Sequence, residues 1–214
     1  MNSIEPQSLR AKAYEAIKDR IITLQYRPGE YLNEALVSAQ LGIGRTPVHQ
    51  ALDRLMHEGM VEVMPRKGVV VKPVSLDDVL ELVDARLVNE PFCARLAAER
   101  VTAENLAAMI DVLERSKAAA ARSDLRSLMK LDREFHACIS AAARNRILAD
   151  FVRTLHDRSM RIWFITLSDH AHSTEVRTQH HGIYDAIAAH DGDLADARSR
   201  AHIEAFRKRL MAAI

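Results

Sequence analysis

The feature that most constrains the fold is the second part of the sequence, after residue 75, which scans as amphipathic helices to its end. Apolar residues recur there at spacings of three and four, the pattern of a helix with one buried face. The chain also holds only seven Gly and six Pro in 214 residues, too few for the tight turns of a β-sandwich. The sequence therefore predicts a mainly α protein whose second part is an all-helical bundle of six or seven helices. Helices are expected at residues 77–100, 103–121, 124–142, 146–167, 173–189 and 193–212.

The first part of the sequence has a different order of elements. Pro47 lies in the first turn of its third helix, where a missing N–H costs nothing, and Gly59 ends that helix. A short helix, a Gly-containing turn, a second helix and a hairpin form the pattern of a winged helix-turn-helix. We therefore predict two domains, residues 1–73 and 77–214. The expected helix, short helix, turn, helix and hairpin cover residues 9–24, 33–40, 41–44, 45–57 and 60–71.

A surface for DNA is expected on the third helix and at the tip of the hairpin. Arginine grips guanine or phosphate, His and Gln donate or accept at base edges, Thr suits a phosphate, and a basic hairpin tip contacts backbone or the minor groove. A glycine at that tip permits close approach to the duplex. The alternative is that these are ordinary solvated side chains of a small helical domain. The candidate DNA-binding residues are Arg45, Thr46, His49, Gln50, Arg66, Lys67 and Gly68.

This first part resembles the DNA-binding domain of the GntR family of bacterial transcription regulators. The similarity covers about residues 10–73 and implies a winged helix that binds double-stranded DNA. Two positions depart from the family pattern: Gly44 stands where Ser or Thr is usual, and His49-Gln50 stands where Arg-Glu is usual. The residues that carry the resemblance are 28–34, 41–48, 51–52, 55, 58–59 and 66–68.

Histidine is concentrated in the second part, which holds eight of the ten, so the two parts are expected to do different chemistry. Asp132 and His136 are four residues apart and share an inward helix face. His180 and His202 stand twelve residues before and ten after Gly192. Two antiparallel helices meeting there would bring them to the same height. Three imidazoles and one carboxylate suit Zn²⁺, Ni²⁺ or another divalent transition metal, although hydrogen-bonded core histidines are the alternative.

The second part resembles the all-helical ligand-binding domain of the FadR-type branch, the FCD domain. The similarity covers about residues 77–210 and implies that Asp132, His136, His180 and His202 hold a divalent metal beside a small carboxylate effector. A guanidinium matches a carboxylate fork, so Arg86 is the candidate anchor for the effector, with an ion pair to Glu90 as its alternative role. The motifs that carry the resemblance lie at residues 84–90, 94–99, 132–136, 180–187 and 201–203.

The remaining histidines are expected to face solvent or to be incidental. Trp163 and Phe164 are candidates for the wall of the pocket, with ordinary core packing as the alternative. Gln179 stands where the family usually has an acidic residue. The six histidines set aside are His57, His156, His170, His172, His181 and His190.

The function expected from these patterns is a ligand-responsive transcription regulator rather than an enzyme. A single winged helix grips few phosphates, so a homodimer on a palindromic operator is expected. Two alternatives remain: a metal-ion sensor without an organic effector, and a metal-dependent hydrolase fused to a DNA-binding module. The second lacks a separate general base and a nucleophile motif. Two cysteines, no export signal and no long apolar run predict a cytoplasmic protein without a membrane segment.

Overall fold

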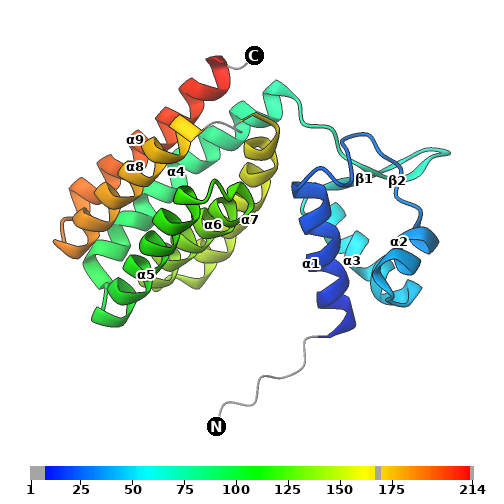
Figure 1. The fold of residues 1–214 in the computed structure, drawn as a ribbon, viewed down its shortest axis with the longest axis horizontal. Helices are drawn as coiled ribbons and strands as arrows, with labels where there is room; N and C mark the ends of the chain where they lie inside the picture. Colours follow the sequence, from blue (N-terminus) through cyan, green and yellow to red (C-terminus); the bar gives the residue numbers. More distant parts are fainter. Residues whose placement is uncertain (1–7, 167–169, 213–214) are drawn as a thin grey trace, which may run out of the picture. The chain divides into compact units, whose positions relative to one another are not determined.

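The computed structural model describes residues 8–166 and 170–212, with the side chains of residues 161, 163–166 and 170–173 left aside. The chain forms two compact units, residues 1–75 and 76–214 (Figure 1). Each has its own buried apolar residues. Trp163 and Phe164, the proposed pocket walls, lie outside the described side chains.

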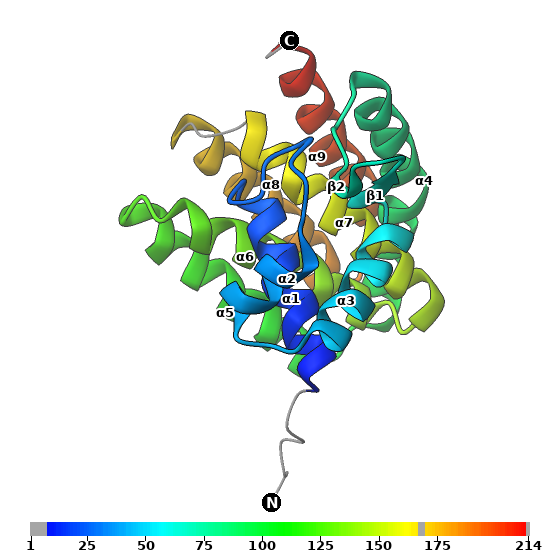
Figure 2. The same cartoon turned by 90° about the vertical axis from the view of Figure 1, so that its right-hand side faces the viewer.

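The first unit is built from three helices and a two-stranded hairpin. Its elements are α1 (Leu9–Ile22), α2 (Glu34–Leu41), α3 (Arg45–His57), β1 (Val61–Met64) and β2 (Gly68–Val71). Helix α3 packs against both α1 and α2, and the three lie close together in both views (Figures 1 and 2). The strands pair antiparallel, with Val61 opposite Val71. The backbone of residues 29–32 also hydrogen-bonds to β2, which ties the hairpin to the helices.

The second unit is a bundle of six described helices. Its elements are α4 (Leu76–Arg100), α5 (Ala103–Ala121), α6 (Leu125–Ala142), α7 (Arg146–Thr166), α8 (His170–Ala188) and α9 (Gly192–Ala212). Helix α4 contacts α6, α7, α8 and α9, and so runs through the centre of the packing. Helices α8 and α9 lie side by side along it (Figure 1). No described helix combines the length and the apolar character needed to cross a membrane.

The expected fold class, a winged helix-turn-helix followed by an all-helical bundle, is confirmed. One helix start was wrong: α8 begins at His170, so His170 and His172 belong to a helix and not to a loop. No large apolar residue precedes Val176 in the sequence of α8, which begins His-Ala-His-Ser-Thr-Glu-Val. Periodicity of apolar residues therefore missed the beginning of the helix.

Candidate nucleic-acid interface and metal centre

Helix α3 separates a buried apolar face from an exposed polar one. Its buried residues are Val48, Ala51, Leu52 and Leu55. The preceding turn uses Gly42 in the left-handed conformation, at φ 63°, and Gly44 caps α3 without a side-chain hydrogen bond. This turn leaves the start of α3 accessible. The exposed residues there are the four candidates Arg45, Thr46, His49 and Gln50.

His49 is held by two carboxylates on the exposed face of α3. Its Nδ1 lies 2.9 Å from Oε1 of Glu34, the first residue of α2, and its Nε2 lies 3.5 Å from Oδ2 of Asp53. The hydrogen bond to Glu34, with the charges of Asp53 and Glu34, raises the pKa of His49. Both the ring orientation and the charge of this imidazole are therefore influenced by α2.

The tip of the hairpin presents two exposed basic residues, Arg66 and Lys67, between β1 and β2. Gly68 follows at φ 82°, and a Cβ at this position would lie 3.0 Å from Cε2 of the Tyr31 ring. Only glycine combines this positive φ with the close approach of Tyr31. Gly68 thus fixes the shape of the basic tip.

The bundle brings together all four residues expected to bind metal. His136 on α6, His180 on α8 and His202 on α9 are buried, and one ring nitrogen from each lies within 4.8 Å of the others. Asp132, one turn before His136, places Oδ1 3.5 Å from Nε2 of His180. The ring of Phe135 stacks on His180 with centroids 4.6 Å apart, which orients that imidazole.

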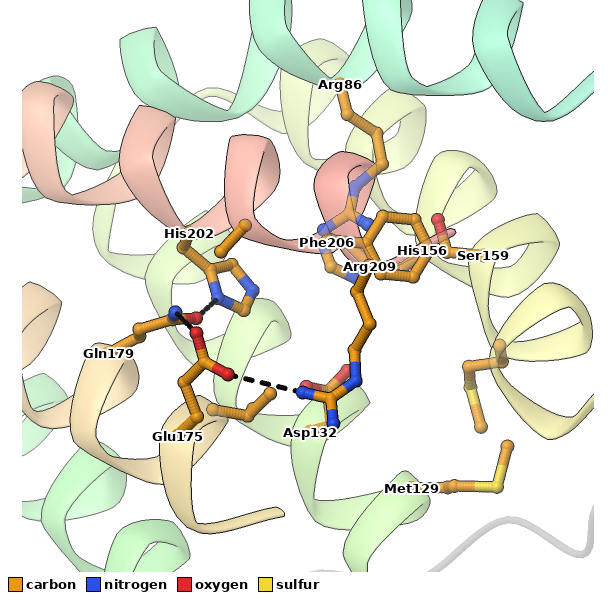
Figure 3. Close-up of a pocket in the computed structure, with 13 residues that line it drawn as sticks. Arg86, Met129, Asp132, His156, Ser159, Glu175, Gln179, His202, Phe206 and Arg209 are labelled. Carbon is orange, nitrogen blue, oxygen red and sulfur yellow. Dashed lines mark hydrogen bonds and ion pairs between the residues drawn. The ribbon is translucent and has the colours of Figure 1, made fainter. Parts of the chain in front are cut away.

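The ring of His202 is oriented by a neighbouring amide. Its Nδ1 lies 2.8 Å from the amide oxygen of Gln179, while the Gln179 amide nitrogen donates to Glu175 at 3.2 Å (Figure 3). An amide oxygen only accepts, so Nδ1 of His202 carries the proton and Nε2 keeps its lone pair. Metal-binding histidines commonly have such a second hydrogen bond.

Burial governs the charges in this cluster. It lowers the pKa of His136 and of His180 well below the ordinary value, and the neighbouring imidazoles add to this effect. Burial also raises the pKa of Asp132 to about 6, against the opposing effect of His156 and Arg86. Nε2 of His136 and Nε2 of His180 are buried without a hydrogen-bond partner among the described residues. Neutral imidazoles with unused nitrogens beside a carboxylate fit a divalent transition metal.

Sequence reasoning missed two members of the cluster, Glu90 on α4 and His156 on α7. The expectation that His156 faces solvent or is incidental was wrong: it is 3% exposed and its ring stacks on His136 at 3.9 Å. A signal was present, because Val152 and Met160 lie four residues on either side and place His156 on the buried face. The sequence pattern indicated Glu90 only as a possible ion-pair partner of Arg86.

Arg86 makes a buried ion pair with Glu90. Its Nε lies 2.6 Å from Oε1 of that carboxylate, and its Nη2 lies 3.3 Å from Oε2. Burial alone would raise the pKa of Glu90, but Arg86 and His156 hold it well below its ordinary value. Arg86 also lines the small cavity beside the cluster (Figure 3). The side chain that pairs with Glu90 is therefore also at the place expected for an effector anchor.

That cavity has a volume of about 20 Å³. Asp132, His156 and His202 line it together with Arg86 and Phe206. Arg209 of α9 and Glu175 of α8 also line it and are 3.2 Å apart in an ion pair (Figure 3). A space of this size admits one ion or a water molecule.

Comparison with known proteins agrees with this architecture. Residues 9–71 match the bacterial regulatory proteins of the gntR family, and residues 81–205 match the FCD domain. An HTH-type transcriptional regulator in the TAR-I ttuE-ttuC' intergenic region of Agrobacterium vitis is 34% identical over 66% of this chain and 85% of its own. The Nta operon transcriptional regulator of Aminobacter aminovorans is 30% identical over 86% of this chain and 85% of its own.

More distant relatives share the same organisation. The transcriptional repressor RspR of Escherichia coli is 25% identical over 92% of this chain and 87% of its own. The structure of E. coli McbR/YncC superimposes with a TM-score of 0.86 over 97% and 99% of the two chains at 22% identity, which shows a common fold. The chain therefore belongs to the GntR family of transcriptional regulators and carries an FCD domain after its helix-turn-helix.

Proposed function

We propose that this regulator binds its operator as a homodimer and that a divalent metal in the bundle, with a small carboxylate effector bound to it, controls operator affinity. The metal ligands are Asp132, His136, His180 and His202. Zn²⁺ and Ni²⁺ suit this donor set best. The domains that carry the two functions are residues 1–73 and 77–214.

The DNA-binding part of the proposal rests on the exposed polar face of α3 and the basic hairpin tip. Arg45, Thr46, His49 and Gln50 stand clear of the apolar core, which leaves them accessible to base edges and phosphates. Arg66, Lys67 and Gly68 form the second contact. Because one winged helix covers a short half-site, a dimer on a palindromic operator with half-sites about one helical turn apart follows.

One observation carries the metal part of the proposal: three buried imidazoles converge, one of them 3.5 Å from the Asp132 carboxylate, with unused nitrogens on His136 and His180. A buried polar atom without a partner costs about 1–3 kcal/mol, and a metal ligand bond removes that cost. The hydrogen bond from His202 to Gln179 supports the same role. When bound, the metal supplies a positive centre with open positions for an anion.

Arg86 is proposed to hold the effector's carboxylate. Its ion pair with Glu90 uses two of its five N–H groups, so donors remain for an anion in the cavity that it lines. The cavity of about 20 Å³ is smaller than an organic acid. We propose that the effector opens the cavity by parting the ion pair between Glu175 on α8 and Arg209 on α9, so that it binds one arrangement of the bundle better than the other.

The experiment is a fluorescence-anisotropy titration of operator DNA with the full-length protein, after chelation, with Zn²⁺ or Ni²⁺, and with the metal plus a panel of small carboxylates. We expect an acid that shifts operator affinity only when metal is present. His202→Asn should abolish the shift and His181→Asn, at a neighbouring histidine outside the cluster, should preserve it. A shift that survives His202→Asn contradicts the proposal.

A second candidate function is metal sensing without an organic effector. The small volume of the cavity favours it, because an ion fits there without movement of α8 or α9. In this case the metal alone changes operator affinity and no acid in the panel adds to the change. The titration above separates the two functions directly.

A further inference from the structure

A second set of potential metal ligands overlaps the first. Glu90 on α4, His136 on α6 and His156 on α7 each place one ligand atom within 4.8 Å of the other two. All three side chains are at least 94% buried. His156 is outside the set of ligands proposed above, and His136 belongs to both triads.

Distances around Glu90 match those of a tetrahedral metal site. Its Oε2 lies 3.1 Å from Nε2 of His156 and 3.7 Å from Nδ1 of His136. With metal–ligand distances of 2.0–2.1 Å, neighbouring ligands of a tetrahedral Zn²⁺ are about 3.3–3.4 Å apart. The observed separations lie on either side of that value, so shifts of a few tenths of an ångström complete these two edges.

Arg86 engages the two oxygens of Glu90 unequally. Oε1 accepts a hydrogen bond from Nε of Arg86 at 2.6 Å, whereas Oε2 accepts a longer one from Nη2 of Arg86 at 3.3 Å and also faces the two imidazoles. A carboxylate can bind a metal through one oxygen while the other accepts a hydrogen bond that orients it. Arg86 thus holds Glu90 in place mainly through Oε1, and a metal on Oε2 would compete only with the longer hydrogen bond from Nη2.

The second triad has its own approach from solvent. A hollow of about 420 Å³ lies along α6 and α7, and His136 and His156 line its inner part. Small side chains widen it, among them Ala137, Ser140 and Ala149. An ion can therefore reach this triad without passing through the cavity bounded by Glu175 and Arg209.

We propose that Glu90, His136 and His156 form a second, alternative position for one divalent metal ion in the bundle. Both positions bond to the same imidazole, His136. Two dications there would repel each other strongly in the buried interior, where Asp132 and Glu90 are the carboxylates of the two positions and Arg86 already balances one of them. One ion per chain therefore occupies one of the two positions at a time. It binds at the second position when the ligands of the first have been removed.

The alternative role of Glu90 and His156 is purely supporting: they orient His136 for the first site. In that case the second triad binds nothing after the first is broken. The inference shares only His136 with the proposed function, and variants that remove His180 and His202 separate the two. Asn replaces the histidines in these variants, because it keeps a polar side chain in the buried cluster.

The test measures binding of Zn²⁺ alone to the full-length protein by competition with a chromogenic chelator. The proteins are the wild type, His180→Asn/His202→Asn, the same pair with His156→Asn, and the same pair with His181→Asn as the matched control. Circular dichroism checks that each variant keeps its helical signal. If the pair loses that signal, the comparison is repeated with Gln in place of Asn at both positions, which still removes both imidazoles of the first site.

The wild type is expected to bind one ion per chain, and the His180→Asn/His202→Asn protein to keep one ion at lower affinity. Adding His156→Asn should weaken binding by a further factor of at least about 10, since loss of an outer-shell partner alone costs about 10–100-fold. Adding His181→Asn should leave it unchanged. A folded pair that binds no Zn²⁺, or binding that is indifferent to His156→Asn, overturns the inference. A pair that binds as tightly as the wild type supports this second position and contradicts the first.

Discussion

At the scale of single residues, the cluster in the bundle depends on which nitrogen of each imidazole is already engaged. Gln179 fixes the proton of His202 on Nδ1, and Phe135 holds the ring of His180 by stacking. Burial keeps His136 and His180 neutral, the form in which imidazole binds metal. The imidazoles therefore already have the protonation and orientation that the proposed metal requires.

Gln179 offers a test of this preparation. Gln179→Ala removes the acceptor for Nδ1–H of His202 and frees the ring to rotate. We expect metal affinity to fall about 10- to 100-fold with little change in helical content. Chelator competition measures the affinity, and Gln50→Ala on exposed α3 serves as the control. Unchanged affinity in Gln179→Ala would show that the amide does not orient His202.

His49 offers a second test, at the DNA-binding face. Its pKa is raised above the ordinary value of 6.5, chiefly by the hydrogen bond to Glu34. The pairing stabilises the first unit fully at pH values below that ordinary value, and the stabilisation is lost as pH rises through the raised pKa. Glu34→Gln should lower the pKa of His49 in an NMR titration, whereas Glu15→Gln on α1 should not. Equal values in all three proteins would contradict the assigned pairing.

The residue scale also shows what the sequence alone can specify. The i, i+4 spacing of Asp132 and His136, and the matched distances of His180 and His202 from Gly192, predicted groups that the fold does bring together. His156 and Glu90 were missed because nothing in their local spacing connects α7 to α4. Such contacts depend on how distant helices pack, which a one-dimensional pattern does not determine.

At the scale of elements, most helix bounds followed from apolar periodicity and from residues that cap or end helices. Thr102 at the start of α5 and Asp124 at the start of α6 accept capping hydrogen bonds. Helix α8 shows the limit of the method, because no large apolar residue occurs in its sequence before Val176. Helix α3 is unusual in another way: its N-cap, Gly44, makes no side-chain hydrogen bond.

Gly44→Ser should therefore stabilise α3. The backbone angles of Gly44, φ −57° and ψ 159°, suit a serine, and a Cβ there would meet no atom closer than 3.8 Å. The serine Oγ adds a capping hydrogen bond. The difference in helix stability between a Ser and a Gly N-cap is about a few tenths of a kcal/mol. Hydrogen exchange of the α3 amides measures the gain. Faster exchange in the variant would contradict it.

Gly68→Ala tests the hairpin in the opposite direction. Alanine would have to keep the positive φ of Gly68, and its methyl group would lie 3.0 Å from the Tyr31 ring. We expect a loss of about 1 kcal/mol in the stability of the first unit, together with weaker operator binding because the tip carrying Arg66 and Lys67 is displaced. Urea unfolding and fluorescence anisotropy measure the two effects. An alanine variant with unchanged stability would show that the tip tolerates another conformation.

At the scale of the whole molecule, the chain contains two compact units with separate chemistry. The exposed residues proposed to bind DNA lie in the first unit, and the buried histidine cluster lies in the second. Every ligand of either proposed metal position comes from α4, α6, α7, α8 or α9. Metal binding is therefore expected to stabilise the second unit directly, through elements that are far apart in the sequence.

Hydrogen exchange of the full-length protein tests this division. A ligand that binds only the folded state, at 100 times its dissociation constant, adds about 2.7 kcal/mol to the stability of the part that binds it. Slowly exchanging amides of α4 and α6–α9 should then gain about 100-fold protection with saturating Zn²⁺, while those of α1–α3 change little. His180→Asn/His202→Asn/His156→Asn should lose the gain in the bundle. Equal protection of both units would mean that they unfold together, and that the metal stabilises the DNA-binding unit as well as the bundle that holds it.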